Sequence, residues 1–204
     1  LLGLFLLVAC FWAIFDQSAS TWIFFGNIYM DQDVFGIPIN AEQMQTWNPV
    51  FIIIMHPFVT WMWNILAKKG INVRATDKMV VGFLLTAATM GVMAYAGHLA
   101  GPAETQEVVK DGVTAVERIA LPDDRKVSLE WQAVAYIVLT IAEILISVTG
   151  LELAFASAPQ SMKSFITAIW LLTVFVANFA INAPISLLYV RMEPNQYFGM
   201  LAVA

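Results

Sequence analysis

Long apolar runs alternate with short polar segments along the whole chain. A helix needs about 20 mostly apolar residues to cross the roughly 30 Å hydrocarbon core of a bilayer. Five runs reach this length, and a sixth begins near the end of the sequence. The pattern therefore predicts an all-α protein whose helices cross a membrane. The predicted spans are residues 1–27, 47–67, 79–100, 131–155 and 165–190, with a partial span at 197–204.

Charges in the connecting loops predict the orientation of these spans. The loop after the second span holds four basic residues and one acid, and the loop after the fourth holds Lys163. Short cytoplasmic loops carry an excess of Lys and Arg, so we expect both loops to face the cytoplasm. The opposite loops, 28–46 and 101–130, are mainly acidic and are expected on the outer side.

The 101–130 loop is too polar to enter lipid. Apolar and polar residues alternate in it on both sides of Asp111-Gly112, a dipeptide typical of two-residue hairpins. We predict a small β-hairpin, with an unstructured linker as the alternative.

Composition agrees with a membrane protein. Of the 204 residues, 60% are hydrophobic and only 12% are charged, against about 25% charged in soluble domains. The mean hydropathy is +0.74. A net charge of −5 argues against nucleic acid as a partner, because phosphate binding requires clustered basic residues. The apolar start at Leu1, without methionine or a preceding basic segment, suggests a cut inside a longer protein.

Two carboxylates lie near mid-depth of predicted spans. Asp16 is in the first span and Glu143 in the fourth. A charged residue at such a depth costs at least about 2.5–3.5 kcal/mol on insertion scales. It persists where it faces water, pairs with a base or takes up a proton, and a buried carboxyl can exchange a proton near neutral pH. A structural role in helix–helix hydrogen bonding is the alternative.

Neither acid has a basic partner in the predicted spans, because no Lys or Arg occurs in any of the five apolar cores. We therefore expect their partners to be water, substrate, or bases on helices outside this chain. Such an arrangement fits half of a larger molecule.

Other polar groups accompany the two acids. Gln17 directly follows Asp16, and Asn48 opens the second span. Asn178 and Asn182 lie in the fifth span, where amides also serve as interhelical hydrogen-bonding groups. Glu152 follows Glu143 by nine residues, which is about 900° of regular helix and would place the two on opposite faces.

Three segments resemble successive parts of the proton-coupled oligopeptide transporter (POT) family. FWAIFDQSASTW resembles the family's seventh helix, TWNPVFIIIMHP its eighth, and AEILISVTGLELAFASAPQSMKS its tenth and the following loop. The segment with Ala168, Trp170 and Asn178 resembles the eleventh. The resemblance implies a major-facilitator fold, in which two six-helix bundles enclose a cavity. This chain would supply helices seven to eleven and the start of twelve.

The same resemblance implies roles for individual residues. Glu143 matches the acid that receives the N-terminal ammonium of a peptide. Asp16 matches an acid of proton coupling, which pairs with an arginine on helix one. Asn48 matches a contact to the peptide backbone, and Trp170 an aromatic wall of the side-chain pocket. We add Gln17 to the predicted substrate-binding residues.

Glu152 lies nearer the cytoplasmic end of the fourth span, and we predict a role in gating, with packing at that end as the alternative. The N-terminal six-helix bundle of the same transporter would supply the basic groups that the chain lacks.

The function that we expect is proton-coupled symport of di- and tripeptides across the cytoplasmic membrane by a multi-pass protein in the lipid bilayer. Protons are the coupling ion, and no metal or other cofactor is expected. The nearest alternative is a transporter of the same fold for nitrate or a small metabolite, although an acid at Glu143 favours an amine over an anion.

A membrane enzyme and a static structural bundle are two further alternatives. A membrane enzyme is disfavoured because the chain has no nucleophile–base motif, HExxH pattern or phosphate-binding loop. A static structural bundle is disfavoured by the two acids at mid-depth.

Overall fold

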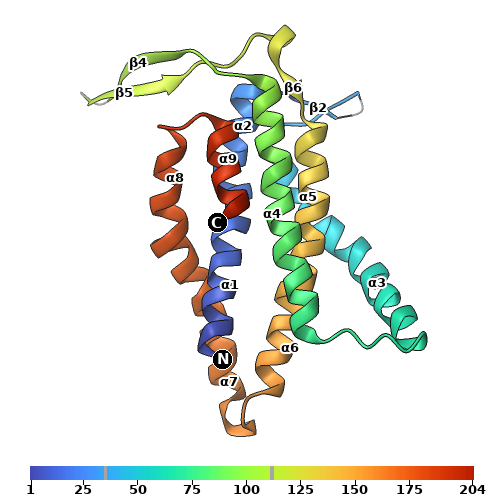
Figure 1. Cartoon of the computed structure of the whole chain (residues 1–204). Coiled ribbons are helices and arrows are strands. Elements are labelled where there is room, and N and C mark those ends of the chain that lie inside the picture. The colour runs from blue at the N-terminus through green and yellow to red at the C-terminus, as the bar shows by residue number, and fades with distance from the viewer. Residues whose placement is uncertain (35, 111–112) are drawn as a thin grey trace.

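The computed structural model of the chain describes residues 1–34, 36–110 and 113–204. Within those residues, five helical runs are long and apolar enough to cross a membrane, and a shorter helix follows them (Figure 1). The five runs are Leu2–Tyr29, Gln43–Lys68, Ala75–Ala100, Glu130–Ala156 and Gln160–Tyr189. The second and fifth begin earlier than the apolar pattern indicates, because short 3₁₀ turns at Gln43–Thr46 and Gln160–Met162 precede their α-helices.

Several of these runs consist of more than one α-helix. The α-helices are α1 (Leu2–Phe15), α2 (Thr21–Tyr29), α3 (Trp47–Lys68), α4 (Ala75–Ala100), α5 (Glu130–Glu143), α6 (Thr149–Ala156), α7 (Lys163–Val176), α8 (Ala183–Tyr189) and α9 (Pro194–Val203). The strands are β1 (Met30–Asp31), β2 (Asp33–Val34), β3 (Ile37–Pro38), β4 (Thr105–Lys110), β5 (Val113–Arg118) and β6 (Val127–Ser128).

Helix α4 packs along α5 and along α9. Bulky aromatic side chains from α2, α5 and α9 fill the larger apolar core, among them Trp22, Tyr136 and Phe198. A second core joins α1, α4, α6 and α7 around Phe11 and Trp170. The two cores together hold the discontinuous spans against the continuous helix α4.

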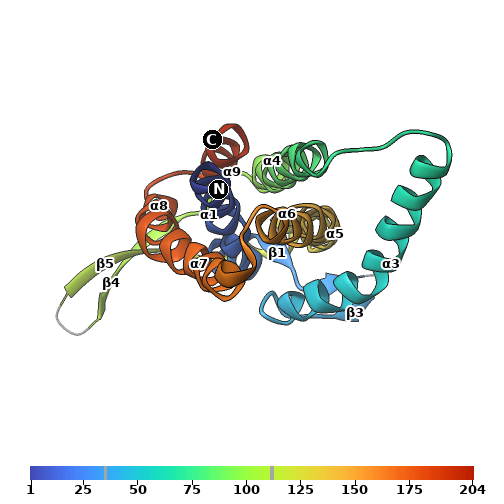
Figure 2. The same cartoon turned by 90° about the horizontal axis from the view of Figure 1, so that it is seen from below.

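Helix α3 stands apart from the rest of the bundle (Figures 1 and 2). Val59 is its one buried residue among those described. Large apolar side chains such as Ile53, Phe58 and Trp61 are more than half exposed. The helix continues through Pro57. An apolar helix with so little protein contact requires lipid or another apolar surface around it.

The strands gather at one end of the bundle, which we call the strand end (Figure 1). Parallel pairing of β1 with β6 joins the loop after α2 to the loop before α5. Strands β4 and β5 pair antiparallel, from Thr105 opposite Arg118 to Lys110 opposite Val113. The predicted hairpin turn, Asp111-Gly112, lies outside the described residues.

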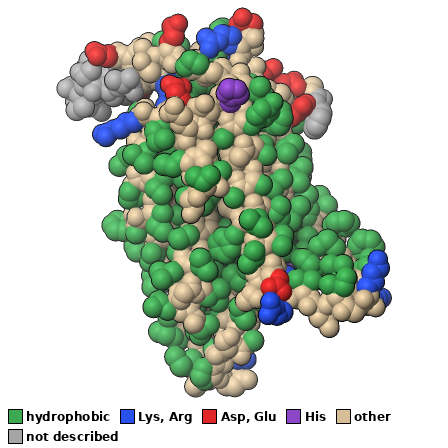
Figure 3. All heavy atoms as spheres, viewed as in Figure 1, with side chains coloured by type: hydrophobic (Ala, Val, Ile, Leu, Met, Phe, Trp, Pro, Cys, Tyr) green, Lys and Arg blue, Asp and Glu red, His purple; other side chains and the backbone are tan. Residues whose placement is uncertain are grey.

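The face of the molecule seen in Figure 3 is apolar between its two ends, and the charged side chains gather at the ends. At the strand end, the side chain of Arg118 donates hydrogen bonds to the carbonyl oxygens of Tyr189, at 3.0 Å, and of Met192. The loop after α4 is thereby attached to the end of α8. Lys163 lies at the opposite end, at the start of α7. The charge pattern is that of a bilayer-spanning bundle.

Candidate functional site

Asp16 lies where the first span is interrupted. Helix α1 ends at Phe15, and a 3₁₀ turn at Asp16–Ala19 and a kink at Ser20 lead into α2. The side chain of Ser20 donates a hydrogen bond to the Asp16 carbonyl oxygen at 3.1 Å, which satisfies a backbone group at the break. The Asp16 carboxylate is thus presented from an irregular segment in the middle of the membrane.

A chain of amides continues from Asp16 into the fifth span. The Nδ2 atom of Asn178 donates to Asp16 Oδ2 at 2.5 Å, and Nδ2 of Asn182 donates to Asn178 Oδ1 at 2.8 Å. The sequence left open whether these amides only join helices. In the structure they do join helices, and one of them also holds the carboxylate.

Gln17 completes this chain on the side away from Asp16. Its Nε2 atom donates to Asn182 Oδ1 at 2.6 Å, and its Oε1 atom accepts from the Tyr197 hydroxyl at 2.7 Å and from Thr21 Oγ1 at 2.8 Å. Gln17 is only 1% exposed. Its predicted contact with substrate stays a prediction, and the observed contacts make it a link between the 3₁₀ turn of the first span, the π-helix of the fifth span and α9.

Glu143 is bonded to an amide on a neighbouring helix. Asn48 Nδ2, at the start of α3, donates to Glu143 Oε2 at 2.9 Å and to Thr140 Oγ1 at 3.3 Å. Thr140 in turn donates to the Tyr136 carbonyl oxygen at 2.8 Å. Asn48 and Glu143, each predicted separately to bind substrate, are therefore in direct contact.

The two acids belong to one region of the bundle. The Tyr136 hydroxyl, two helical turns before Glu143, donates to the Ser18 carbonyl oxygen at 3.1 Å, inside the break that carries Asp16. Among the described residues, no basic side chain forms an ion pair with either acid.

In the first, fourth and fifth spans, the helix departs from regular α geometry at or next to the polar residues. The fourth span winds as a π-helix over Ile144–Val148, directly after Glu143, and the fifth over Ala177–Asn182, which includes both asparagines. Proline explains the second case, because Pro184 has no N–H to bond the Ala180 carbonyl. Such π-turns frequently occur at functional sites.

Trp170 lies on α7, two turns before Asn178, and packs closely against α6. A Cβ atom added to Gly150 would lie 2.8 Å from the Trp170 ring, so only glycine permits this approach. Phe5 meets the same ring edge-on, with 6.5 Å between ring centres. Trp170 is thus fixed in position, and it lines a pocket together with Glu152. Its predicted contact with a peptide stays a prediction.

The expectation that Glu143 and Glu152 face opposite sides is wrong, because it assumed a regular α-helix. The π-helix at Ile144–Val148 lies between them. A turn closed by i→i+5 bonds takes about one more residue than an α-turn, so nine residues rotate through about 800° instead of 900°. The two acids are then about 80° apart around the helix axis. The gating role predicted for Glu152 stays a prediction.

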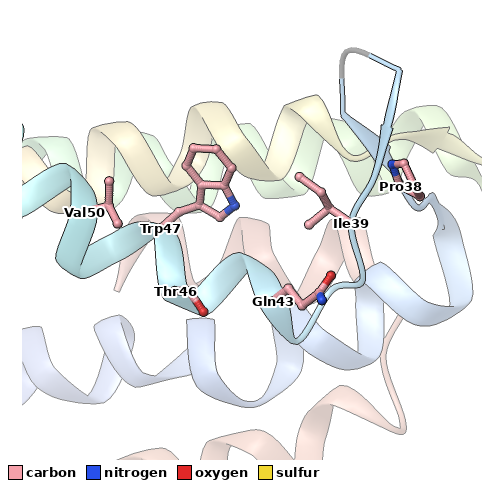
Figure 4. Close-up of a pocket in the computed structure, with 6 residues that line it drawn as sticks. All are labelled: Pro38, Ile39, Gln43, Thr46, Trp47 and Val50. Carbon is pink, nitrogen blue, oxygen red and sulfur yellow. The ribbon is translucent and has the colours of Figure 1, made fainter.

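A larger pocket, of about 590 Å³, lies at the start of α3 and is drawn in Figure 4. Trp47 and Val50 of α3 and Ile39 of the preceding segment contribute apolar walls, and Gln43 and Thr46 contribute polar groups. The neighbouring Asn48 makes its contacts with α5 and is not part of this lining.

Thr140, Tyr136 and Ser186 also belong to the polar networks, although the sequence did not single them out. Ser186 donates to Asn182 Oδ1 at 2.9 Å. Their positions carried a usable signal, because Thr140 lies three residues before Glu143 and Ser186 four residues after Asn182, on the same helix faces. Among residues 1–34, 36–110 and 113–204, no group of three or more His, Cys, Asp or Glu is placed to hold a metal ion.

The described residues form five helices of membrane length, and two acids inside these helices bind amides on neighbouring helices. These are the features of a membrane transport protein. The structure superimposes on the crystal structure of a peptide transporter POT in complex with sulfate with a TM-score of 0.78 and 26% sequence identity. The superposition covers 99% of this chain and 36% of the solved one. A sequence model described as the POT family matches residues 1–199. The chain belongs to the POT family.

Curated relatives agree with this assignment. The peptide transporter YePEPT of Yersinia enterocolitica is 31% identical over 172 residues, which cover 84% of this chain and 30% of the relative. Solute carrier family 15 member 2 of Rattus norvegicus is 53% identical over 53 residues, 26% of this chain and 7% of the relative. The chain thus spans about a third of the length of YePEPT and of the solved transporter.

These findings confirm three of the predictions. The chain belongs to the predicted family, its fold is that of part of an all-α membrane transporter, and it is an integral membrane protein.

Proposed function

We propose that the transporter to which this chain belongs carries di- and tripeptides together with protons across the cytoplasmic membrane. The observation that supports this most is the Glu143 carboxylate, held at mid-depth of the fourth span by Asn48 with no basic partner among the described residues. A buried carboxylate in this state requires a cation or a proton to compensate its charge. The ammonium group of a peptide is such a cation, and proton symport would supply the proton.

Peptide binding is built around Glu143. Asn48 engages Oε2, so Oε1 is the oxygen that accepts a hydrogen bond from the peptide ammonium. Asn48 also retains a side-chain carbonyl oxygen, which suits a peptide N–H. The carboxylate end of the peptide requires a basic group, which we assign to the N-terminal six-helix bundle of the same transporter.

Proton binding is assigned to Asp16. Asn178 holds one of its oxygens, Oδ2, and leaves the other for a proton. The Tyr136–Ser18 bond places Asp16 and Glu143 in one region of the bundle, and like charges repel, so neutralising one acid makes the other easier to keep charged. A proton on Asp16 therefore strengthens the attraction of Glu143 for an ammonium group. This repulsion couples proton binding at Asp16 to peptide binding at Glu143.

We assign the helix movements of transport to the irregular segments of the first, fourth and fifth spans. Each lies beside Asp16, Glu143 or Asn178, so changes in charge occur where the helices already depart from α geometry. Rocking of this bundle against the N-terminal bundle around the bound peptide would give alternating access.

The first test is dipeptide uptake by the full-length transporter in liposomes, with and without an inward proton gradient. We expect accumulation of Ala-Ala driven by the gradient, and its loss in Glu143→Gln, which keeps the shape of the side chain but removes its charge. Uptake of Ala-Ala that is unchanged in Glu143→Gln contradicts the assignment of Glu143. A folded protein that does not take up peptides, but does take up nitrate or another small metabolite, supports the alternative substrate class.

A further inference from the structure

A second pocket lies between the fourth and fifth spans, apart from the Glu143–Asn48 contact. It measures about 420 Å³, within the size range of small-ligand sites. Its walls come from the π-helix, α6 and α7. The lining residues are Ser147, Val148, Leu151, Glu152, Phe155 and Trp170.

Two polar groups of this pocket have no partner within the described part of the chain. The Ser147 hydroxyl is buried and makes no hydrogen bond. The Glu152 carboxylate, on the exposed rim, forms no hydrogen bond or ion pair there. A carboxylate accepts hydrogen bonds and donates none, so a ligand that donates hydrogen bonds is favoured in this pocket.

The remaining walls define the shape of that ligand. Val148, Leu151, Phe155 and Trp170 offer apolar walls beside one carboxylate. Lys and Arg side chains match this arrangement, because they bury an apolar stem while a charged group reaches a polar rim. Arg and Lys cations are also attracted to aromatic rings. A neutral side chain would leave Glu152 unpaired, and an acidic one would be repelled by it.

The distance to the peptide site fits a side chain of the transported peptide. Glu152 lies nine residues beyond Glu143, about 13 Å along a helix, and the π-turn brings both acids toward the same side. An extended dipeptide spans about 7 Å. The remaining distance of about 6 Å matches the reach of a four-carbon lysine stem.

We propose that Glu152, together with Ser147 and Trp170, forms a subsite for the positively charged side chain of a peptide, and that it makes the transporter prefer peptides with a second-position Lys or Arg. The proposal rests on the peptide-transport function proposed above. It assigns Glu152 a role in substrate selection that differs from gating.

The test measures uptake of Ala-Ala, Ala-Lys and Ala-Glu by the full-length transporter in liposomes. In the wild-type protein we expect Ala-Lys to have a KM about tenfold lower than Ala-Glu. Glu152→Gln should raise the KM for Ala-Lys about fivefold to tenfold and leave that for Ala-Ala within twofold. Glu152→Lys should reverse the preference toward Ala-Glu. Glu130→Gln, which removes a partly exposed acid at the strand end of the same span, is the control and should change none of these values.

Each alternative has a distinct result. If Glu152→Gln lowers the transport of all three peptides equally, Glu152 acts in gating and the subsite is wrong. If the preference for Ala-Lys survives in both Glu152 variants, the charged side chain binds elsewhere and the proposal is also wrong. If the wild-type protein takes up none of the three peptides, peptide transport itself fails, which is separable from either outcome.

Discussion

The side-chain amide of Asn178 donates a hydrogen bond of 2.5 Å to the carboxylate of Asp16, across 162 positions of sequence. The bond joins the 3₁₀ break of the first span to the π-helix of the fifth. Its donor is fixed in turn by Asn182 and, through it, by Gln17. Under the proposed proton coupling, protonation of Asp16 would therefore change a contact between two discontinuous helices.

Replacing Asn178 with Leu tests this contact. The substitution removes a hydrogen bond to a charged group, a contribution of about 1.5–3 kcal/mol. We expect proton-driven peptide uptake to fall about tenfold or more and its pH dependence to shift, while peptide exchange without a proton gradient is retained. Thr167→Ala is the control, because Thr167 bonds only its own helix through the Lys163 carbonyl oxygen. An unaltered pH profile in Asn178→Leu would show that the contact is structural.

Replacing Asn48 with Ala tests the support of Glu143. The variant removes the donors to Glu143 Oε2 and Thr140 Oγ1, so we expect the KM for Ala-Ala to rise about tenfold with a smaller change in maximal rate. Asn64→Ala, at an exposed position of the same helix, is the matched control. Equal losses in both variants would mean that α3 tolerates no substitution and that Asn48 has no special role.

Replacing Gly150 with Ala tests the position of Trp170. The new Cβ atom would lie 2.8 Å from the Trp170 ring, so the ring or α6 must move. We expect a loss of about 1–3 kcal/mol in stability, measured as a lower melting temperature in detergent. Gly91→Ala should be tolerated, because nothing lies within 4 Å of its added Cβ atom. Equal melting temperatures for both variants would contradict the close packing of Trp170.

Replacing Arg118 with Ala tests the attachment of the loop at the strand end. The guanidinium group bonds the carbonyl oxygens of Tyr189 and Met192 and lies over the Tyr189 ring, 5.0 Å from its centre. We expect the variant to be cleaved about tenfold faster by protease within residues 101–130, since these bonds contribute about 1–3 kcal/mol. Arg125→Ala, which removes a bond to the Pro102 carbonyl oxygen, serves as the comparison. Unchanged cleavage in Arg118→Ala would show that other contacts hold the loop.

The sequence predicts the spans closely because each depends on a local property. A helix of about twenty apolar residues is long enough to cross the bilayer, whichever helices pack beside it. The boundaries at Gln43 and Gln160 differ from the prediction because polar 3₁₀ turns extend the apolar runs, and hydropathy does not detect them.

The sequence also identifies Asp16, Glu143 and Asn48 as polar groups of the candidate site, and the structure brings Asn48 and Glu143 into contact. It does not predict which amide meets which acid. The pairing of Asp16 with Asn178 depends on how the first and fifth spans pack, and no local pattern contains that information.

By itself, then, the sequence determined the number and length of the spans and the depth of the two acids, because hydrophobic burial in lipid acts on each segment separately. The tertiary structure decided where the helices break, which polar groups pair, and that Glu152 lines a pocket with Trp170. A π-turn redirects every side chain that follows it along its helix, and packing against neighbouring helices selects it. For this reason the face of Glu152 could not be read from a regular helical repeat.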